Sequence, residues 1–117
     1  VKLFGYVSTR DLARLYCGAV GLALVSLYEG FGLPVVEAFA CGCPVLGTTA
    51  GSVPEIAGGA ALLADPLDDQ QIEMRLEQLL SEESLRQELS RKGLARAQAF
   101  SWDKAARQCL EVYRELV

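Results

Sequence analysis

The chain has 117 residues, which is enough for one compact domain and too few for two. Apolar residues make up 51% of it, so it can bury a sizeable core, and its longest nearly uncharged stretch is too interrupted by Gly and Pro to cross a membrane as a helix. The net charge of −4 argues against binding nucleic acid or anionic membrane by bulk attraction, and the lack of His removes the commonest general base and metal ligand.

The four cysteines predict free thiols rather than a zinc site. They are Cys17, Cys41, Cys43 and Cys109. None belongs to a CxxC pair, and the Cys41-x-Cys43 spacing is too tight for the usual zinc finger. We interpret them as reduced, mostly buried thiols of a cytoplasmic protein.

Short apolar segments alternate with helical ones through the first 64 residues. The expected strands are, in chain order, 2–7, 20–27, 45–48 and 60–64. Ser8 is expected to cap a helix that Gly18 ends, and Pro34 to open a second helix that Gly42 stops. Between the last two strands we expect a loop with one helical turn near Pro54.

Beyond Pro66 the pattern becomes helical. The expected apolar stripes are Ile72, Leu76, Leu79 and Leu80; then Leu85, Leu89, Ala97 and Phe100; then Trp102, Ala105, Ala106, Cys109, Tyr113 and Leu116. Gly93 lies on the second stripe and permits a close approach, Ser101 caps the third helix, and we interpret all three stripes as core packing. The alternation predicts an α/β fold: a partial Rossmann-like, doubly wound parallel sheet of about four strands with C-terminal helices.

The loop between the second strand and its helix is the candidate site. Ligands of open parallel sheets bind at the carboxyl ends of the strands. Gly30 and Gly32 let the backbone approach a ligand closely, and the free amides that open the next helix favour a phosphate. Because many strand–glycine–helix turns bind nothing, this pattern alone is a weak signal.

Two carboxylates sharpen the prediction. Glu29 lies on the loop and Glu37 lies about one turn into the helix. A carboxylate repels phosphate but accepts hydrogen bonds from hydroxyls, and it can hold the vicinal diol of a ribose. Amides for phosphate and carboxylates for hydroxyls together describe a sugar nucleotide. The residues leave one alternative open, in which Glu37 only favours the helix dipole and Glu29 is a solvated loop charge.

The segment from Glu29 to Val45, with seven residues between the two carboxylates, resembles the motif of a family of retaining glycosyltransferases. This is family four of the GT-B glycosyltransferases, which includes sucrose synthases, bacterial glycogen synthases and phosphatidylinositol mannosyltransferases. The similarity extends over almost the whole chain, through residues 1–7, Ser26, 51–55 and 97–102. Its main departure is Cys43, where the family more often has Thr or Ser.

The resemblance implies a role for each candidate residue. Glu37 inherits contact with the ribose of the donor, and Glu29 is the catalytic candidate, in contact with the hydroxyls of the transferred sugar and stabilising charge. The other implied donor-binding positions are Gly30, Phe31, Gly32 and Leu33 at the diphosphate, with Tyr6 and Val7 lining the base pocket.

The implied reaction transfers a glycosyl group from a nucleoside diphosphate sugar to a sugar, lipid or polysaccharide acceptor, with retained configuration and no metal or other cofactor. Without His or an obvious acid–nucleophile pair, the residues fit front-face attack, in which the departing phosphate takes the acceptor proton. In the family the diphosphate-binding Arg and Lys and the acceptor-binding Rossmann domain precede Val1. We therefore expect a donor-binding fragment, inactive alone, of a cytoplasmic or membrane-peripheral enzyme.

The sequence also bears on three other interpretations. A dinucleotide-dependent oxidoreductase would need Gly-x-Gly-x-x-Gly, whereas Gly30-Phe31-Gly32 is followed by Leu-Pro-Val. A glycosidase would need two carboxyls flanking a sugar, which the spacing alone permits. The third is a truncated or degenerate nucleotide-binding module that interacts without catalysis.

The family strand order also leads to an expectation about pairing. The strands at 20–27, 45–48 and 60–64 should be sheet neighbours, while two strands that separate them from the strand at 2–7 are missing. We therefore expect either that residues 2–6 cross to pair beside 20–27, or that two chains associate through their open edges.

Overall fold

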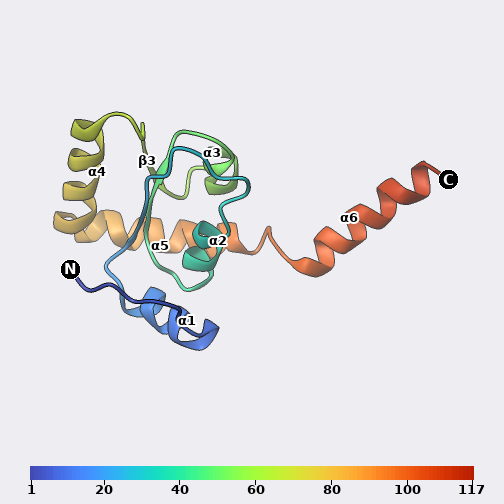
Figure 1. Cartoon of the computed structure of the whole chain (residues 1–117), viewed down its shortest axis with the longest axis horizontal. Coiled ribbons are helices and arrows are strands. Elements are labelled where there is room, and N and C mark those ends of the chain that lie inside the picture. The colour runs from blue at the N-terminus through green and yellow to red at the C-terminus, as the bar shows by residue number, and fades with distance from the viewer.

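The computed structural model describes residues 1–117, folded as six helices and three strands (Figure 1). The elements are, in chain order, α1 (Thr9–Gly18), β1 (Leu22–Leu24), α2 (Leu33–Ala40), β2 (Val45–Thr48), α3 (Val53–Ala57), β3 (Leu62–Ala64), α4 (Asp69–Ser81), α5 (Glu83–Ala97) and α6 (Trp102–Glu115). None of the helices is both long and apolar enough to span a membrane.

The three strands form one parallel sheet in the order β1-β2-β3. Leu22 is paired with Val45 across the first ladder, and Leu46 with Leu62 across the second. The predicted α/β class is confirmed, as is the predicted adjacency of the three strands. The observed β1 and β3 are shorter than the segments predicted at 20–27 and 60–64.

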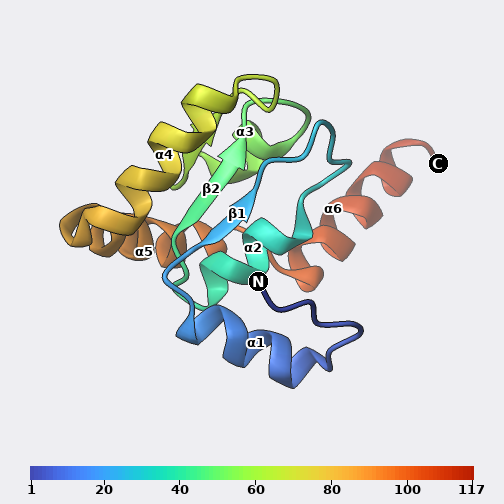
Figure 2. The same ribbon diagram turned by 60° about the vertical axis from the view of Figure 1, so that its left-hand side comes forward.

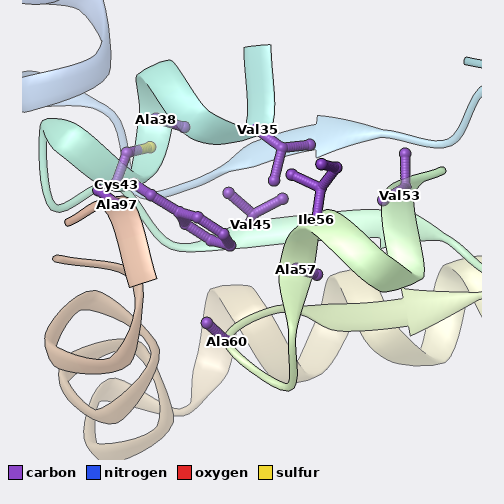
Figure 3. Packing of buried hydrophobic residues seen from close by; sticks show 10 residues of the cluster. Val35, Ala38, Cys43, Val45, Val53, Ile56, Ala57, Ala60 and Ala97 are labelled. Atoms are coloured by element: carbon purple, nitrogen blue, oxygen red, sulfur yellow. The ribbon is translucent and has the colours of Figure 1, made fainter. Parts of the chain in front are cut away.

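Helices cover both faces of the sheet (Figure 2). Successive residues of a strand point to opposite faces, and accordingly Val45 packs into a cluster with α2 and α3 while Leu46 packs into a second cluster with α4 and α5. All four residues of β2 are buried, so this central strand is the middle of the core. Figure 3 shows the first cluster, in which Val35 and Ile56 meet Val45.

Local signals mark the helix ends as predicted. The side chains of Ser8 and Ser101 each accept a hydrogen bond from an amide in the first turn of the following helix, and Asp68, which was not predicted as a cap, does the same for α4. Gly42 follows α2 with φ +68°, a left-handed conformation that favours glycine. The predicted close approach at Gly93 is also present, because a Cβ there would lie 2.7 Å from Phe39 Cδ1.

The predicted strand at residues 2–7 is wrong. This segment is irregular, it makes no backbone hydrogen bond to the sheet, and its side chains are exposed except that of Val7, which is half-buried. An apolar sequence does not by itself pair a segment with a strand: the outer edge of β1 is open, since β1 pairs with β2 alone, yet residues 2–7 do not pair with it. The sheet therefore has three strands rather than about four, and residues 2–6 do not cross to β1. Association of two chains through their edges stays a prediction.

The interpretation of the last helix as core is also wrong. Every residue from 101 to 117 is exposed, and Trp102, on the predicted inner face, is 82% exposed. In Figure 1, α6 extends away from the rest of the domain, so its apolar stripe meets no other element. The first stripe is buried only in part, at Leu79 and Ile72, whereas Leu89, Gly93 and Ala97 of the second stripe are buried as expected.

Candidate active site

The loop from residue 25 to residue 32 joins the carboxyl end of β1 to α2. Gly32, with φ +91°, turns the chain into the helix, and Pro34 occupies the first turn. No side chain caps α2. As a result, the backbone N–H groups of Gly30, Phe31, Gly32 and Leu33 donate no hydrogen bond within the protein. Four free N–H donors next to the positive end of a helix dipole can bind an anion.

Glu29 lies on this loop with its carboxylate held in place. The hydroxyl of Ser26 donates a hydrogen bond of 2.8 Å to Glu29 Oε1, and the glutamate is half-buried. Oε2 has no partner in the protein. Since a carboxylate oxygen accepts hydrogen bonds from hydroxyls, the site leaves one oxygen of Glu29 available to a ligand.

The loop after β2 packs against the main chain of Glu29. A Cβ on Gly51 would lie 2.9 Å from the Glu29 carbonyl oxygen, and Gly51 has φ +64°. The residue after Gly51 is Ser52, whose Oγ is 3.0 Å from the Glu29 carbonyl oxygen and 2.8 Å from the carbonyl oxygen of Phe31. The loops that follow two neighbouring strands are thus bonded to each other, as expected at the ligand-binding edge of a parallel sheet.

Glu37 is exposed one turn into α2 and is contacted from α1. The hydroxyl of Tyr16 donates to Glu37 Oε2 at 3.3 Å. Burial and, next, the neighbouring Glu37 carboxylate raise the pKa of Tyr16 to about 12. The Tyr16 phenol therefore stays protonated at neutral pH and continues to donate its hydrogen bond. Its contribution to the free energy of folding is complete below pH 10 and is lost as the pH rises toward 12.

The candidate loop packs against the segment that follows α5. The rings of Phe31 and Phe100 meet edge to face, with centroids 6.1 Å apart. The guanidinium of Arg96 lies 5.0 Å from the Phe100 centroid and donates to the carbonyl oxygens of Glu55 and Ile56 at the end of α3. A rigid support of this kind keeps the free amides in one arrangement.

The comparison with known proteins agrees with this geometry. A sequence model of the family "Glycosyl transferases group 1" matches residues 1–96.

The chain belongs to this family.

Its relatives act on sugars. It is 40% identical over 116 residues to the O-antigen chain mannosyltransferase B of Escherichia coli. This match covers 99% of this chain and 30% of the relative. It is 36% identical over 115 residues to the MMP alpha-(1->4)-mannosyltransferase of Mycolicibacterium hassiacum, covering 95% of this chain and 28% of the relative. The chain thus spans about a third of the length of such relatives.

Solved structures give the same result. The sucrose-phosphate synthase of Thermosynechococcus elongatus superimposes with a TM-score of 0.86 at 31% identity, over 97% of this chain and 29% of that one. The C-terminal domain of a glycosyl transferase group 1 family protein from Francisella tularensis superimposes with a TM-score of 0.71, also at 31% identity, over 82% of this chain and 51% of that one. Both are glycosyltransferase structures, so the suspected family and the Rossmann-like fold are confirmed.

The structure brings most of the predicted site residues together. Glu29 and the four free amides lie on one loop, and Glu37 lies on the helix that this loop opens. Two predicted positions remain apart: Tyr6 is 98% exposed, and the segment containing Tyr6 and Val7 runs along α1 in both Figure 1 and Figure 2. Their place in a base pocket stays a prediction.

The thiols are free, as expected, but not mostly buried. Cys17 and Cys109 are exposed, Cys41 is half-buried and only Cys43 is buried. Burial raises the pKa of the Cys41 and Cys43 thiols, which disfavours the reactive thiolate. Of the four, only Cys43 belongs to the hydrophobic core.

Sequence reasoning missed Tyr16 as part of the site, and this residue supports a first test. Replacing Tyr16 by Phe should raise the KM for the sugar donor about threefold to tenfold with little change in kcat. The reason is that Glu37 loses the hydroxyl whose hydrogen bond orients its carboxylate. Steady-state kinetics of the complete protein measure this. Tyr113→Phe on the exposed α6 is the matched control. An unchanged KM for the sugar donor in Tyr16→Phe would show that the contact between Tyr16 and Glu37 has no effect on donor binding.

Proposed function

We propose that the chain supplies the donor-binding site of a retaining glycosyltransferase, which transfers a hexosyl group from a nucleoside diphosphate sugar to a sugar, lipid or polysaccharide acceptor. One observation carries the proposal: a row of free backbone amides lies in the chain between two carboxylates, Glu29 and Glu37, and each carboxylate accepts a hydrogen bond from a hydroxyl. Membership of the family and the names of the relatives support it.

The two ends of the donor match different parts of this site. The diphosphate binds the amides of Gly30 to Leu33 at the positive end of α2. Glu37 accepts hydrogen bonds from the ribose diol with Oε1, which Tyr16 leaves free, and with the remaining lone pair of Oε2. Glu29 then lies beside the transferred sugar, and its unpaired Oε2 contacts a sugar hydroxyl and stabilises positive charge at the anomeric carbon.

The proposed transfer step needs no base from the protein. The bond from the anomeric carbon to the leaving phosphate oxygen breaks, while the acceptor oxygen attacks from the same face. The departing phosphate takes the acceptor proton, so no side chain has to act as a base. We propose that amides and basic side chains stabilise the leaving diphosphate without a metal. Residues 25–33 contain no Lys or Arg, so the basic groups come from other parts of the complete protein.

Replacing Glu37 by Ala in the complete protein tests this proposal. The donor KM should rise about tenfold or more with kcat little changed, because ribose contacts stabilise bound donor and transition state alike. Glu73→Ala on the exposed surface of α4 is the matched control. A wild-type donor KM in Glu37→Ala would contradict the assigned role.

A second readout does not depend on turnover. When UDP, GDP or ADP is titrated into isotope-labelled protein, the amide resonances of residues 30–37 should shift first. For this chain alone the affinity should be weak, because its donor loop lacks basic partners. Shifts confined to residues 68–117 would place the nucleotide elsewhere and refute the proposal.

A further inference from the structure

The hydroxyl of Ser52 joins two loops that follow different strands. Its Oγ lies within hydrogen-bonding distance of two carbonyl oxygens, that of Glu29 at 3.0 Å and that of Phe31 at 2.8 Å. The backbone N–H of Ser52 also donates to the Glu29 carbonyl, at 3.5 Å. Because a hydroxyl carries one proton, Ser52 Oγ donates it to one of the two carbonyl oxygens or shares it between them, so the loop after β2 is bonded to the candidate donor loop beside Gly30.

None of these bonds is needed to form α3, although Ser52 is the N-cap residue of that helix. Its side chain makes no capping bond, and its backbone angles, φ −83° and ψ −13°, are those of an ordinary helical residue. The first bond of the helix runs from the Ile56 N–H to the Ser52 carbonyl and does not involve the hydroxyl. Alanine at position 52 would keep the helix and the backbone bond to Glu29, and would lose only the hydroxyl bonds between the loops.

Gly51 makes the close approach of the two loops possible. Its φ of +64° is in the left-handed region, and a Cβ would come within 2.9 Å of the Glu29 carbonyl oxygen and 3.2 Å of the Glu29 nitrogen. Both contacts are with backbone, which cannot swing aside as a flexible side chain does. The main chain at Gly51 thus lies directly against Glu29, and Ser52 adds the hydrogen bonds.

We propose that Ser52 is a positioning residue for glycosyl transfer. By holding the carbonyl groups of Glu29 and Phe31, it fixes the distance between the Glu29 carboxylate and the free amides that follow Gly30. Glu29 is then held twice, by Ser52 at its main chain and by Ser26 at its carboxylate. The inference rests on the proposed function for what the held groups do; the bonds between the loops do not depend on it.

This arrangement predicts an effect on turnover rather than on donor affinity. Glu37 lies on α2 and is oriented by Tyr16, so the ribose contact survives when the loop loosens. The contact near the anomeric carbon depends on small displacements of Glu29, and misplacement of a reacting group by about 1 Å costs up to about 100-fold in rate. Loss of the Ser52 hydroxyl should therefore lower kcat and leave the donor KM nearly unchanged.

The test compares Ser52→Ala, Ser52→Thr and Ser84→Ala in the complete protein. Ser52→Ala should lower kcat about tenfold while the donor KM and the thermal midpoint stay near wild type. Ser52→Thr keeps a hydroxyl at Cβ and should recover kcat to within about threefold. Ser84 is exposed on α5 without a side-chain hydrogen bond, so Ser84→Ala should behave as wild type.

Backbone order parameters of residues 29–33, measured by NMR relaxation on isotope-labelled protein, supply the readout that needs no turnover. They should fall in Ser52→Ala and stay at wild-type values in the other two variants. A wild-type kcat in Ser52→Ala overturns the positioning role, and wild-type order parameters overturn the bonds between the loops. If the wild-type protein transfers no sugar, the proposed function fails, but the order parameters still decide whether Ser52 orders the loop.

Discussion

Replacing Glu29 by Ala is expected to lower kcat of the complete protein by about 100- to 1000-fold while the donor KM changes only a few-fold. Ser26 holds one oxygen of this carboxylate and the other is unpaired, so the group is already oriented before the donor binds. Such preorganised charge acts most strongly on the positive charge that develops at the anomeric carbon. The ribose and diphosphate contacts at Glu37 and the free amides are untouched, which preserves donor affinity.

Steady-state kinetics with a matched pair of variants separate charge from hydrogen bonding at Glu29. Glu29→Gln keeps the length of the side chain and one acceptor oxygen but removes the charge. If charge stabilisation dominates, Gln and Ala lower kcat alike; if a sugar hydroxyl is the main partner, Gln retains much of kcat. A wild-type kcat in Glu29→Ala would refute the catalytic assignment. The thermal midpoints of both variants report whether the loop itself has changed.

Most of the local structure could be predicted because its signals lie next to each other in the chain. β2 has the bounds predicted from its apolar run, 45–48. α2 is opened by Pro34 and stopped by Gly42, and Ser101 caps α6, because proline, glycine and serine act on the backbone within one turn. The same holds for the site loop, where two glycines and two carboxylates are close in sequence.

The contacts that complete the site could not be predicted, since they depend on which elements pack together. Tyr16 reads as one more apolar position of α1, yet its hydroxyl reaches Glu37, which lies 21 residues further along. The Ser52 hydroxyl bonds to Glu29, 23 residues earlier, rather than capping α3. Each of these partners is identified only once the helix or loop that carries it has been placed against the donor loop.

Two of the incorrect predictions, the strand at residues 2–7 and the buried face of α6, have one physical cause. Apolar patterning indicates that a segment can bury a face, but burial needs a partner surface. Residues 2–7 do not pair with the open edge of β1, and the stripe of α6 that includes Trp102 and Tyr113 faces no other element. Gly93 is the opposite case. The sequence predicted a close approach at this glycine without the partner, and the partner is the fully buried ring of Phe39.

Replacing Phe39 by Ala should lower the free energy of unfolding by about 3–5 kcal/mol, the usual cost of removing a buried aromatic ring. Phe39 has no exposed surface and joins α2 to α5 through Gly93. Urea denaturation of the chain, with the midpoint and the slope both fitted, measures the loss. A cost below about 1 kcal/mol would show that the ring is not packed as the structure has it.

A double-mutant cycle with Gly93→Ala identifies the contact itself. Alone, Gly93→Ala should destabilise by about 1–3 kcal/mol, because the new Cβ would lie 2.7 Å from Phe39 Cδ1 in a core without room to shift. In the Phe39→Ala background this cost should vanish, since the ring is gone and Ala is a better helix former than Gly by about 1 kcal/mol. Gly18→Ala, whose Cβ meets nothing within 4 Å, controls for helix propensity and should not destabilise in either background. Additive effects of the Phe39 and Gly93 replacements would mean that α2 and α5 do not meet at this pair.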